Sequence, residues 1–102
     1  MNYDLSVVVL CYKAESFIRT FVKQLQEELS NANINFEMVL VANYDSKNDR
    51  TPEIANDLAL IYDNITVGAQ VKEGKMGWDM RSGLRAATGD YIAIIDGDGQ
   101  CR

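Results

Sequence analysis

The chain has 102 residues, of which 47 % are hydrophobic and 25 % are charged, and it contains a single proline. A chain of this length builds one small domain around one core, and its ordinary composition predicts order throughout. The net charge of −5 repels polyanions, which argues against nucleic acid or an anionic membrane surface as a partner of this segment. Phosphate binding would therefore need a metal ion.

The two cysteines indicate the compartment. Cys11 lies in an apolar run and Cys101 is the last residue but one, so they lack the spacing of a disulfide framework or a zinc site. We therefore expect a reducing, cytoplasmic setting, which allows a full-length protein at the cytoplasmic face of a membrane. The start lacks the positive flank of a signal peptide. The apolar run of residues 7–11 is far shorter than the roughly 20 residues of a membrane span.

Short β-branched runs alternate with amphipathic stretches along the chain. This pattern predicts an α/β fold, a three-layer sandwich with a mostly parallel central sheet covered on both faces. Residues 5–10 are expected to form the first strand, and residues 31–35 to end the helix that follows. The apolar stripe of that helix, at four-residue spacing, is Phe17, Phe21, Leu25 and Leu29.

The middle of the chain repeats the pattern. Residues 38–41 predict a second strand, and Thr51 and Pro52 predict the start of a second helix, as N-cap and first helical residue. Residues 65–71 predict a third strand. The apolar residues expected to face inward are Ile54, Leu58 and Ile61 in the helix and Ile65, Val67 and Ala69 in the strand.

A third helix is predicted after this strand. Gly74 and Gly77 lead into it, and Gly89 is placed to end it as a C′ glycine. Residues 91–95 predict a fourth strand, which delivers residues 96–100 at its carboxyl end. The apolar positions of the third helix are Met80, Leu84 and Ala87.

Open parallel sheets bind ligands beyond the carboxyl ends of their strands, where residues 11–16, 43–50 and 96–100 are expected. The last of these loops contains Asp96-Gly97-Asp98. Its two carboxylates are hard oxygen ligands that suit Mg²⁺ or Mn²⁺, with substrate phosphates and waters in the remaining positions. A solvated turn is the alternative interpretation, because Asp and Gly are common in turns.

Other candidate residues flank the same end of the sheet. Lys75 and Arg81 lie near the start of the third helix, where a helix N-terminus with basic neighbours suits an anion. Alternatively, Arg81 and Arg85 form a solvated stripe at four-residue spacing. Tyr12 could lie along a base or ribose and Glu15 could accept from a hydroxyl, although both are also ordinary residues near a helix start.

Taken together, these motifs resemble the N-terminal, nucleotide-sugar-binding half of family 2 glycosyltransferases of the GT-A fold. Within the family they look most similar to dolichol-phosphate mannose synthase and polyprenyl-phosphate sugar transferases. The resemblance covers nearly the whole chain, which would be a single unit, residues 1–102, that stops after the Asp-x-Asp loop. The blocks that carry it are residues 6–12, 37–43, 75–83 and 87–91, followed by Asp96-Gly97-Asp98.

The resemblance implies metal-dependent transfer of a sugar, with inversion, from a GDP- or UDP-sugar to an acceptor such as a polyprenyl phosphate or a saccharide. Asp98 would be the principal ligand of Mg²⁺ or Mn²⁺, and Asp96 would face the ribose or diphosphate beside it. The family's catalytic base lies after this motif, so this segment would bind donor without turnover. The donor-lining residues implied are Leu10, Tyr12, Glu15, Asn43, Lys75, Gly77, Arg81 and Gly97.

Some positions depart from the family pattern. Cys11, Lys13 and Ala14 stand where a proline, an asparagine and acids are usual, and Ala42 and Asn43 replace two aspartates, which leaves the base open. A nucleotidyltransferase is a rival interpretation, but residues 11–16 lack its glycine-rich loop. A non-enzymatic nucleotide-binding or regulatory module is another. A sheet that stops at its fourth strand also predicts self-association of this segment.

Overall fold

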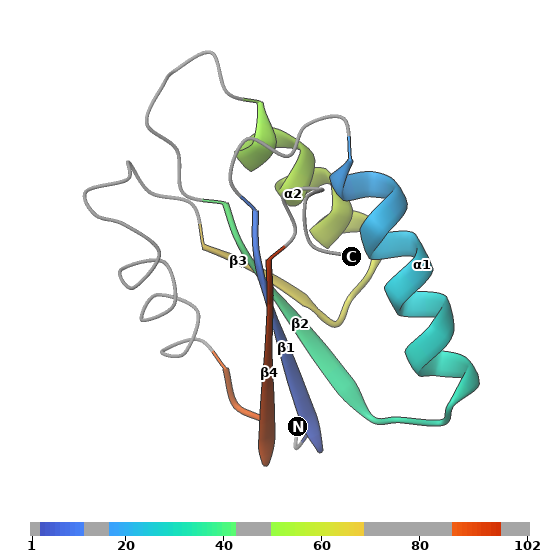
Figure 1. The fold of residues 1–102 in the computed structure, drawn as a ribbon. Coiled ribbons are helices and arrows are strands. Elements are labelled where there is room, and N and C mark those ends of the chain that lie inside the picture. The colour runs from blue at the N-terminus through green and yellow to red at the C-terminus, as the bar shows by residue number, and fades with distance from the viewer. Residues whose placement is uncertain (1–2, 12–16, 43–49, 69–86, 97–102) are drawn as a thin grey trace.

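The computed structural model describes residues 3–11, 17–42, 50–68 and 87–96. They form a four-stranded parallel sheet in the order β3-β2-β1-β4, with two helices (Figure 1). The predicted α/β class with a parallel central sheet is therefore confirmed, and the predicted third helix falls in residues 69–86, outside the described ones. The elements are β1 (Leu5–Leu10), α1 (Ile18–Asn31), β2 (Phe36–Val41), α2 (Thr51–Ile61), β3 (Ile65–Gly68) and β4 (Tyr91–Asp96).

Strand β1 lies between β2 and β4 and sets the register of both. At its amino end Leu5 pairs with Phe36 of β2 and with Tyr91 of β4, and at its carboxyl end Leu10 pairs with Asp96. Because every pairing is parallel, the carboxyl ends of the strands meet at one edge of the sheet.

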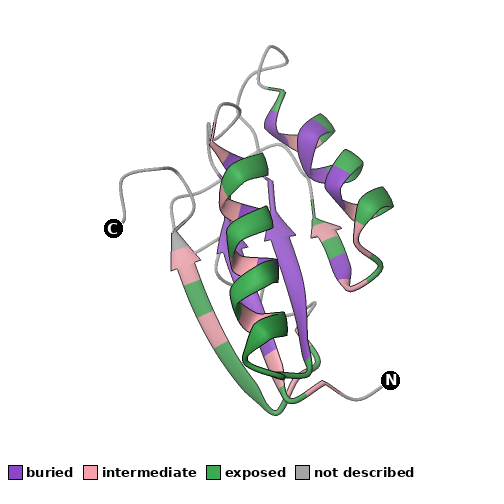
Figure 2. Ribbon diagram, turned by 90° about the vertical axis from the view of Figure 1, so that its right-hand side faces the viewer, coloured by how far each residue is buried: buried purple, intermediate pink, exposed green. Residues whose placement is uncertain are grey.

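Helices α1 and α2 pack on the same face of the sheet (Figure 1). Buried parallel strands are apolar on both faces, which explains the nearly uninterrupted apolar runs of β1 and β2. Figure 2 shows these two strands buried, whereas β4 is intermediate to exposed. The core between sheet and helices includes Val7, Val9, Met38, Leu40, Ile18, Val22, Ile54 and Leu58, and a smaller cluster on the other face contains Val8, Leu10, Val39 and Val41.

The buried stripe of α1 differs from the predicted one by a single position. Ile18 and Val22 are fully buried. The predicted Phe21, Leu25 and Leu29 are partly buried and pack against the same core, and Phe21 stacks on Phe17 with ring centroids 5.4 Å apart. The helix therefore presents the line that starts at Ile18 to the sheet, and the phenylalanines flank it. Neither described helix is long and apolar enough to cross a membrane.

The end of α1 confirms the prediction that residues 31–35 stop the helix. Asn33 takes the left-handed conformation with φ of 58°, which asparagine adopts more readily than most residues. The amide of Asn33 donates to the carbonyl of Ser30 at 3.0 Å, and the amide of Ile34 donates to the carbonyl of Leu29 at 3.2 Å. These two bonds form a Schellman motif, which satisfies carbonyls at the helix end.

Two predictions about α2 are wrong. Thr51 is the first helical residue and Arg50 is the N-cap, without a side-chain capping bond, so the helix starts one residue earlier than expected. Ile61 is 66 % exposed, because it borders an open hollow at the amino ends of the strands and not the sheet. Ile54 and Leu58 are buried as predicted.

The approach to β4 corrects the interpretation of Gly89. Its φ lies outside the left-handed region, so it is not a C′ glycine. The glycine is required for space, since a Cβ there would lie 2.7 Å from both the backbone nitrogen and the Oγ of Ser6.

In β3, Ile65 is buried and Val67 half-buried as predicted, while residues 69–71 fall outside the described part.

Candidate functional site

The strand order places a topological switch point between β1 and β4. From β1 the chain continues to β2 and β3 on one side, and β4 then pairs with the opposite edge of β1. Open α/β sheets bind ligands at such a point, beyond the carboxyl ends of the two strands. Leu10 and Asp96, the last residues of β1 and β4, are paired there.

Backbone hydrogen bonds extend the order of this edge just past the strand ends. The amide of Cys11 donates to the carbonyl of Val41 at 2.9 Å, and the amide of Ala42 donates to the carbonyl of Gly68 at 2.7 Å. Cys11 is 1 % exposed, and its thiol donates to the carbonyl of Val9 at 3.4 Å. Cys11 and Ala42, the residues that follow β1 and β2, are therefore held by backbone hydrogen bonds at this edge of the sheet.

Leu10 and Asp96 are the two predicted site residues whose backbone the structure describes. Leu10 is 6 % exposed and belongs to the smaller core cluster with Val8 and Val41. Its side chain thus packs within the fold and offers little surface to a ligand. The other predicted site residues, outside the described part of the chain, are Tyr12, Glu15, Asn43, Lys75, Gly77, Arg81, Gly97 and Asp98.

The fit of a divalent metal depends on the carboxylates after β4. Asp96 ends β4 at the switch point, and Asp98 follows it in the sequence. Their carboxylate oxygens match the ligand preference of Mg²⁺ and Mn²⁺. Within residues 3–11, 17–42, 50–68 and 87–96, no three side chains of His, Cys, Asp or Glu gather into a metal-binding group.

A polar cluster that was not predicted from the sequence joins the buried Ser6 of β1 and Glu37 of β2 to the turn before β4. Oε2 of Glu37 accepts hydrogen bonds from Oγ of Ser6 at 2.6 Å, from the amide of Thr88 at 2.7 Å and from Oγ1 of Thr88 at 2.8 Å. The amide of Gly89 donates to Oγ of Ser6 at 2.6 Å. We call these four residues the Glu37 cluster.

The hydrogen bonds keep Glu37 ionised in spite of its burial. Burial raises the pKa of the Glu37 carboxyl, but the donors of Ser6, Thr88 and Gly89 together hold that pKa below its ordinary value. The sequence carried a signal for this cluster: Ser6 and Glu37 are the polar residues in the apolar runs of β1 and β2. A buried polar side chain needs hydrogen-bonding partners.

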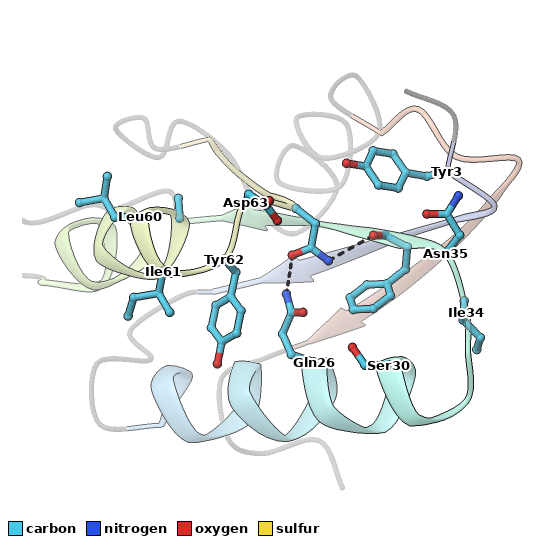
Figure 3. A pocket seen from close by; sticks show the side chains of 12 residues that line it. Tyr3, Gln26, Ser30, Ile34, Asn35, Leu60, Ile61, Tyr62 and Asp63 are labelled. Carbon is cyan, nitrogen blue, oxygen red and sulfur yellow. Dashed lines mark hydrogen bonds between the residues drawn. The ribbon is translucent and has the colours of Figure 1, made fainter.

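A hollow of about 720 Å³ lies at the opposite end of the sheet. It is lined by residues near the amino ends of β2 and β3 and the carboxyl ends of the helices (Figure 3). On one wall, Nε2 of Gln26 donates to Oδ1 of Asn64 at 2.8 Å, and Nδ2 of Asn64 donates to the carbonyl of Phe36 at 3.2 Å. These amides are engaged with the protein, and the hollow is remote from the switch point.

Comparison with known proteins shows that the chain is similar to glycosyltransferases. The family model described as glycosyl transferase family 2 matches residues 6–102. The chain is 32 % identical to the inferred glycosyltransferase EpsH and 33 % identical to the uncharacterized glycosyltransferase EpsJ, each over 91 % of this chain. It is 31 % identical to the minor teichoic acid biosynthesis protein GgaB over 95 % of this chain. All three are from Bacillus subtilis (strain 168), and the chain spans 25 %, 25 % and 10 % of their respective lengths.

Proposed function

The chain belongs to glycosyl transferase family 2, and from this premise we propose that it forms the donor-binding part of an enzyme that transfers a sugar from a nucleoside diphosphate sugar to an acceptor with inversion. The observation that carries the proposal is the pairing of Leu10 with Asp96 at the β1/β4 switch point. This pairing puts the start of an acidic segment where the fold class binds its ligands.

Several residues around this point are proposed to contact the donor. Asp96 faces the ribose or diphosphate, and Asp98 is the principal metal ligand. The positive charges of Lys75 and Arg81 would stabilise the departing diphosphate, because charge develops on it as the glycosidic bond breaks. The residues proposed to line the nucleoside and the rest of the donor are Tyr12, Glu15, Asn43, Gly77 and Gly97.

A divalent cation, Mg²⁺ or Mn²⁺, would supply Lewis-acid stabilisation of the diphosphate when bound. The chain's contribution is to supply carboxylates at the switch point that would hold this cation. With a net charge of −5, this segment would repel a diphosphate unless a cation joined the two.

The acceptor is proposed from chemistry and from the relatives. Both a polyprenyl phosphate and a saccharide present an oxygen nucleophile that could attack the anomeric carbon. The name of GgaB refers to minor teichoic acid biosynthesis, and on this relative we keep the saccharide as an acceptor. A similarity to dolichol-phosphate mannose synthase would favour the lipid phosphate instead, so both acceptors belong in the assay.

Calorimetric titration of the natural-length protein tests the donor part of the proposal. UDP or GDP should bind in Mn²⁺, should bind more weakly in EDTA, and should bind more tightly than the corresponding monophosphate. Equal affinity for the diphosphate in Mn²⁺ and in EDTA would contradict metal-bridged binding. Transfer is then assayed with the preferred nucleotide's sugars, and an α-linked donor should yield a β-linked product.

A further inference from the structure

We propose that Glu37 is a positioning residue for the donor site, acting by fixing β4, and with it Asp96, on β1. The inference rests on the proposed function, since it takes the end of β4 as part of the donor site. Glu37 itself lies far from that end. Ser6 pairs with Glu37 on one side and with Ile92 on the other, four residues before the Leu10–Asp96 pair. At about 3.3 Å per residue this is a separation of roughly 13 Å.

Apolar packing leaves β4 weakly held among the described residues. Tyr91, Ile92 and Ile94 are 75 %, 45 % and 39 % exposed, although they belong to a strand paired with β1, which is buried from Ser6 onward. Ile95 is the β4 residue that packs on the main core cluster. A strand with so little buried surface is poorly protected against a shift in register, which would move every side chain to the other face.

The hydrogen bonds of the Glu37 cluster fix the backbone just before β4. Glu37 is 6 % exposed and Ser6 is fully buried, and they hold the amides of Thr88 and Gly89 at 2.7 Å and 2.6 Å. Each of these amides precedes β4 by three residues or fewer. A charged acceptor makes shorter and stronger hydrogen bonds than a neutral one.

Close packing at the same point prevents the turn from sliding. The Cβ that a side chain would add at Gly89 falls 2.7 Å from the backbone nitrogen of Ser6 and 2.8 Å from the carbonyl carbon of Leu5. Two backbone bonds then lead into the strand: the amide of Asp90 donates to the carbonyl of Tyr3 at 3.2 Å, and the amide of Tyr91 donates to the carbonyl of Asp4 at 3.0 Å. The register of β4 is thus set before its first residue.

This arrangement gives a physical role to a carboxylate in a buried strand. Replacing a buried polar group by an apolar one often costs little stability, whereas polar groups can specify one arrangement among several. Here the arrangement specified is the register of β4, and the consequence of that register is the position of Asp96 beside Leu10.

The test compares variants of the natural-length protein in two measurements. Hydrogen exchange reports the protection of the β4 amides, and calorimetry reports the affinity of the folded protein for UDP or GDP in Mn²⁺. Ser6→Ala and Thr88→Val each remove one hydroxyl of the cluster, and Glu37→Gln keeps one acceptor oxygen without the charge. Glu37→Ala removes the acceptor. Val22→Ala is the control, because it weakens the fully buried core under α1 outside the cluster.

Glu37→Ala and Ser6→Ala should speed exchange along β4 by about tenfold and weaken nucleotide binding by about the same factor, because each removes hydrogen bonds that fix the strand. Glu37→Gln should keep part of the exchange protection and of the nucleotide affinity that Glu37→Ala loses. Thr88→Val should lose less protection and less affinity than Ser6→Ala. Val22→Ala should lower the melting temperature and leave affinity and β4 exchange unchanged.

Two results would overturn the inference. One is unchanged affinity in Ser6→Ala and Thr88→Val, the variants expected to fold even if Glu37→Ala does not. The other is a loss of affinity in Val22→Ala as large as that in the cluster variants, which would show that the cluster affects binding only through the overall stability of the fold. If the wild type binds no nucleotide with Mn²⁺, the proposed function fails and the donor-site role of Glu37 fails with it. Exchange at β4 then still decides whether the cluster fixes the strand.

Discussion

Ser6 and Glu37 are paired across β1 and β2, and the hydroxyl of Ser6 donates a 2.6 Å hydrogen bond to Oε2 of Glu37. The ion pairs among the described residues, Arg19–Asp57 and Arg50–Glu53, lie elsewhere and join exposed side chains. Such surface pairs contribute little to stability. The charge of Glu37 is therefore stabilised by hydrogen bonds from neutral groups, which makes it sensitive to changes in those groups.

The first prediction concerns pH. The pKa of Glu37 in the folded protein lies below its ordinary value of 4.5, so its charge stabilises the fold fully above that value. This stabilisation is lost as the pH falls from about 4.5 through the folded pKa. Glu37→Gln should lower the free energy of unfolding by about 1–3 kcal/mol at pH 7, and the difference from wild type should shrink below pH of about 4.5.

Urea unfolding of both proteins at pH 7, 5.5 and 4 measures this difference. The other carboxyl groups titrate in both proteins, so subtracting one curve from the other isolates Glu37. A difference that stayed constant down to pH 4, or grew, would show that the carboxylate is not stabilised in its ionised form.

The second prediction uses two glycines as a matched pair. A Cβ at Gly89 would meet Ser6 and Leu5 backbone atoms at 2.7–2.8 Å, whereas a Cβ at Gly68 would meet no atom of the described structure within 4 Å. Gly89→Ala should therefore cost about 1–3 kcal/mol of stability, and Gly68→Ala should be neutral or slightly stabilising. Thermal unfolding of the two variants measures this, and equal melting temperatures would mean that the turn before β4 can move aside.

These residues also show how far the sequence could predict the fold. The bounds of β1, residues 5–10, were predicted correctly because a buried parallel strand is apolar along its length. The start of α2 was misplaced by one residue, since an adjacent Thr and Pro fit both possible positions at a helix start. The predicted stripe of α1 packs on the core in part, but the fully buried line begins at Ile18 and not at Phe17. Both residues are apolar, so only tertiary packing selects between the two lines.

The candidate site was predictable only in part. The sequence placed Asp96 at the carboxyl end of a strand, and the structure shows it at the end of β4. The bond between Thr88 and Glu37 spans 51 positions and depends on β4 joining the β1 edge opposite β2. Hydrophobic periodicity identifies strands but not their order in a sheet, so neither the switch point nor the Glu37 cluster could be derived from it.

The third prediction compares two leucines of α2. Leu58 is 4 % exposed and belongs to the main core, whereas Leu60, two residues later, is 88 % exposed. Leu58→Ala should lower the free energy of unfolding by about 2–5 kcal/mol because it leaves a cavity. Leu60→Ala should change it by less than about 0.5 kcal/mol. Chemical denaturation of both variants provides the measurement, and a large effect at Leu60 would show that this side chain is covered in the natural-length protein.

The fourth prediction separates the proposed metal site from a solvated turn at Asp96-Gly97-Asp98. If both carboxylates serve a metal, they repel each other when none is bound. Asp98→Asn should then leave the metal-free protein as stable as wild type, or slightly more stable, and should abolish most of the Mn²⁺-dependent nucleotide binding. If the aspartates instead accept hydrogen bonds from nearby backbone groups, the same variant should lose about 1 kcal/mol of stability and keep its response to metal.

Melting temperatures with UDP or GDP in Mn²⁺ and in EDTA distinguish the two cases. Asp90→Asn is the matched control, because Asp90 is an exposed residue just before β4, at the end of the strand opposite Asp96. Under the metal hypothesis, the control keeps the wild-type rise in melting temperature with Mn²⁺ and nucleotide, and Asp98→Asn loses it. An Asp98→Asn protein that melts lower in EDTA yet keeps the full rise would assign the motif to a turn, because its carboxylate would then contribute to folding and not to binding.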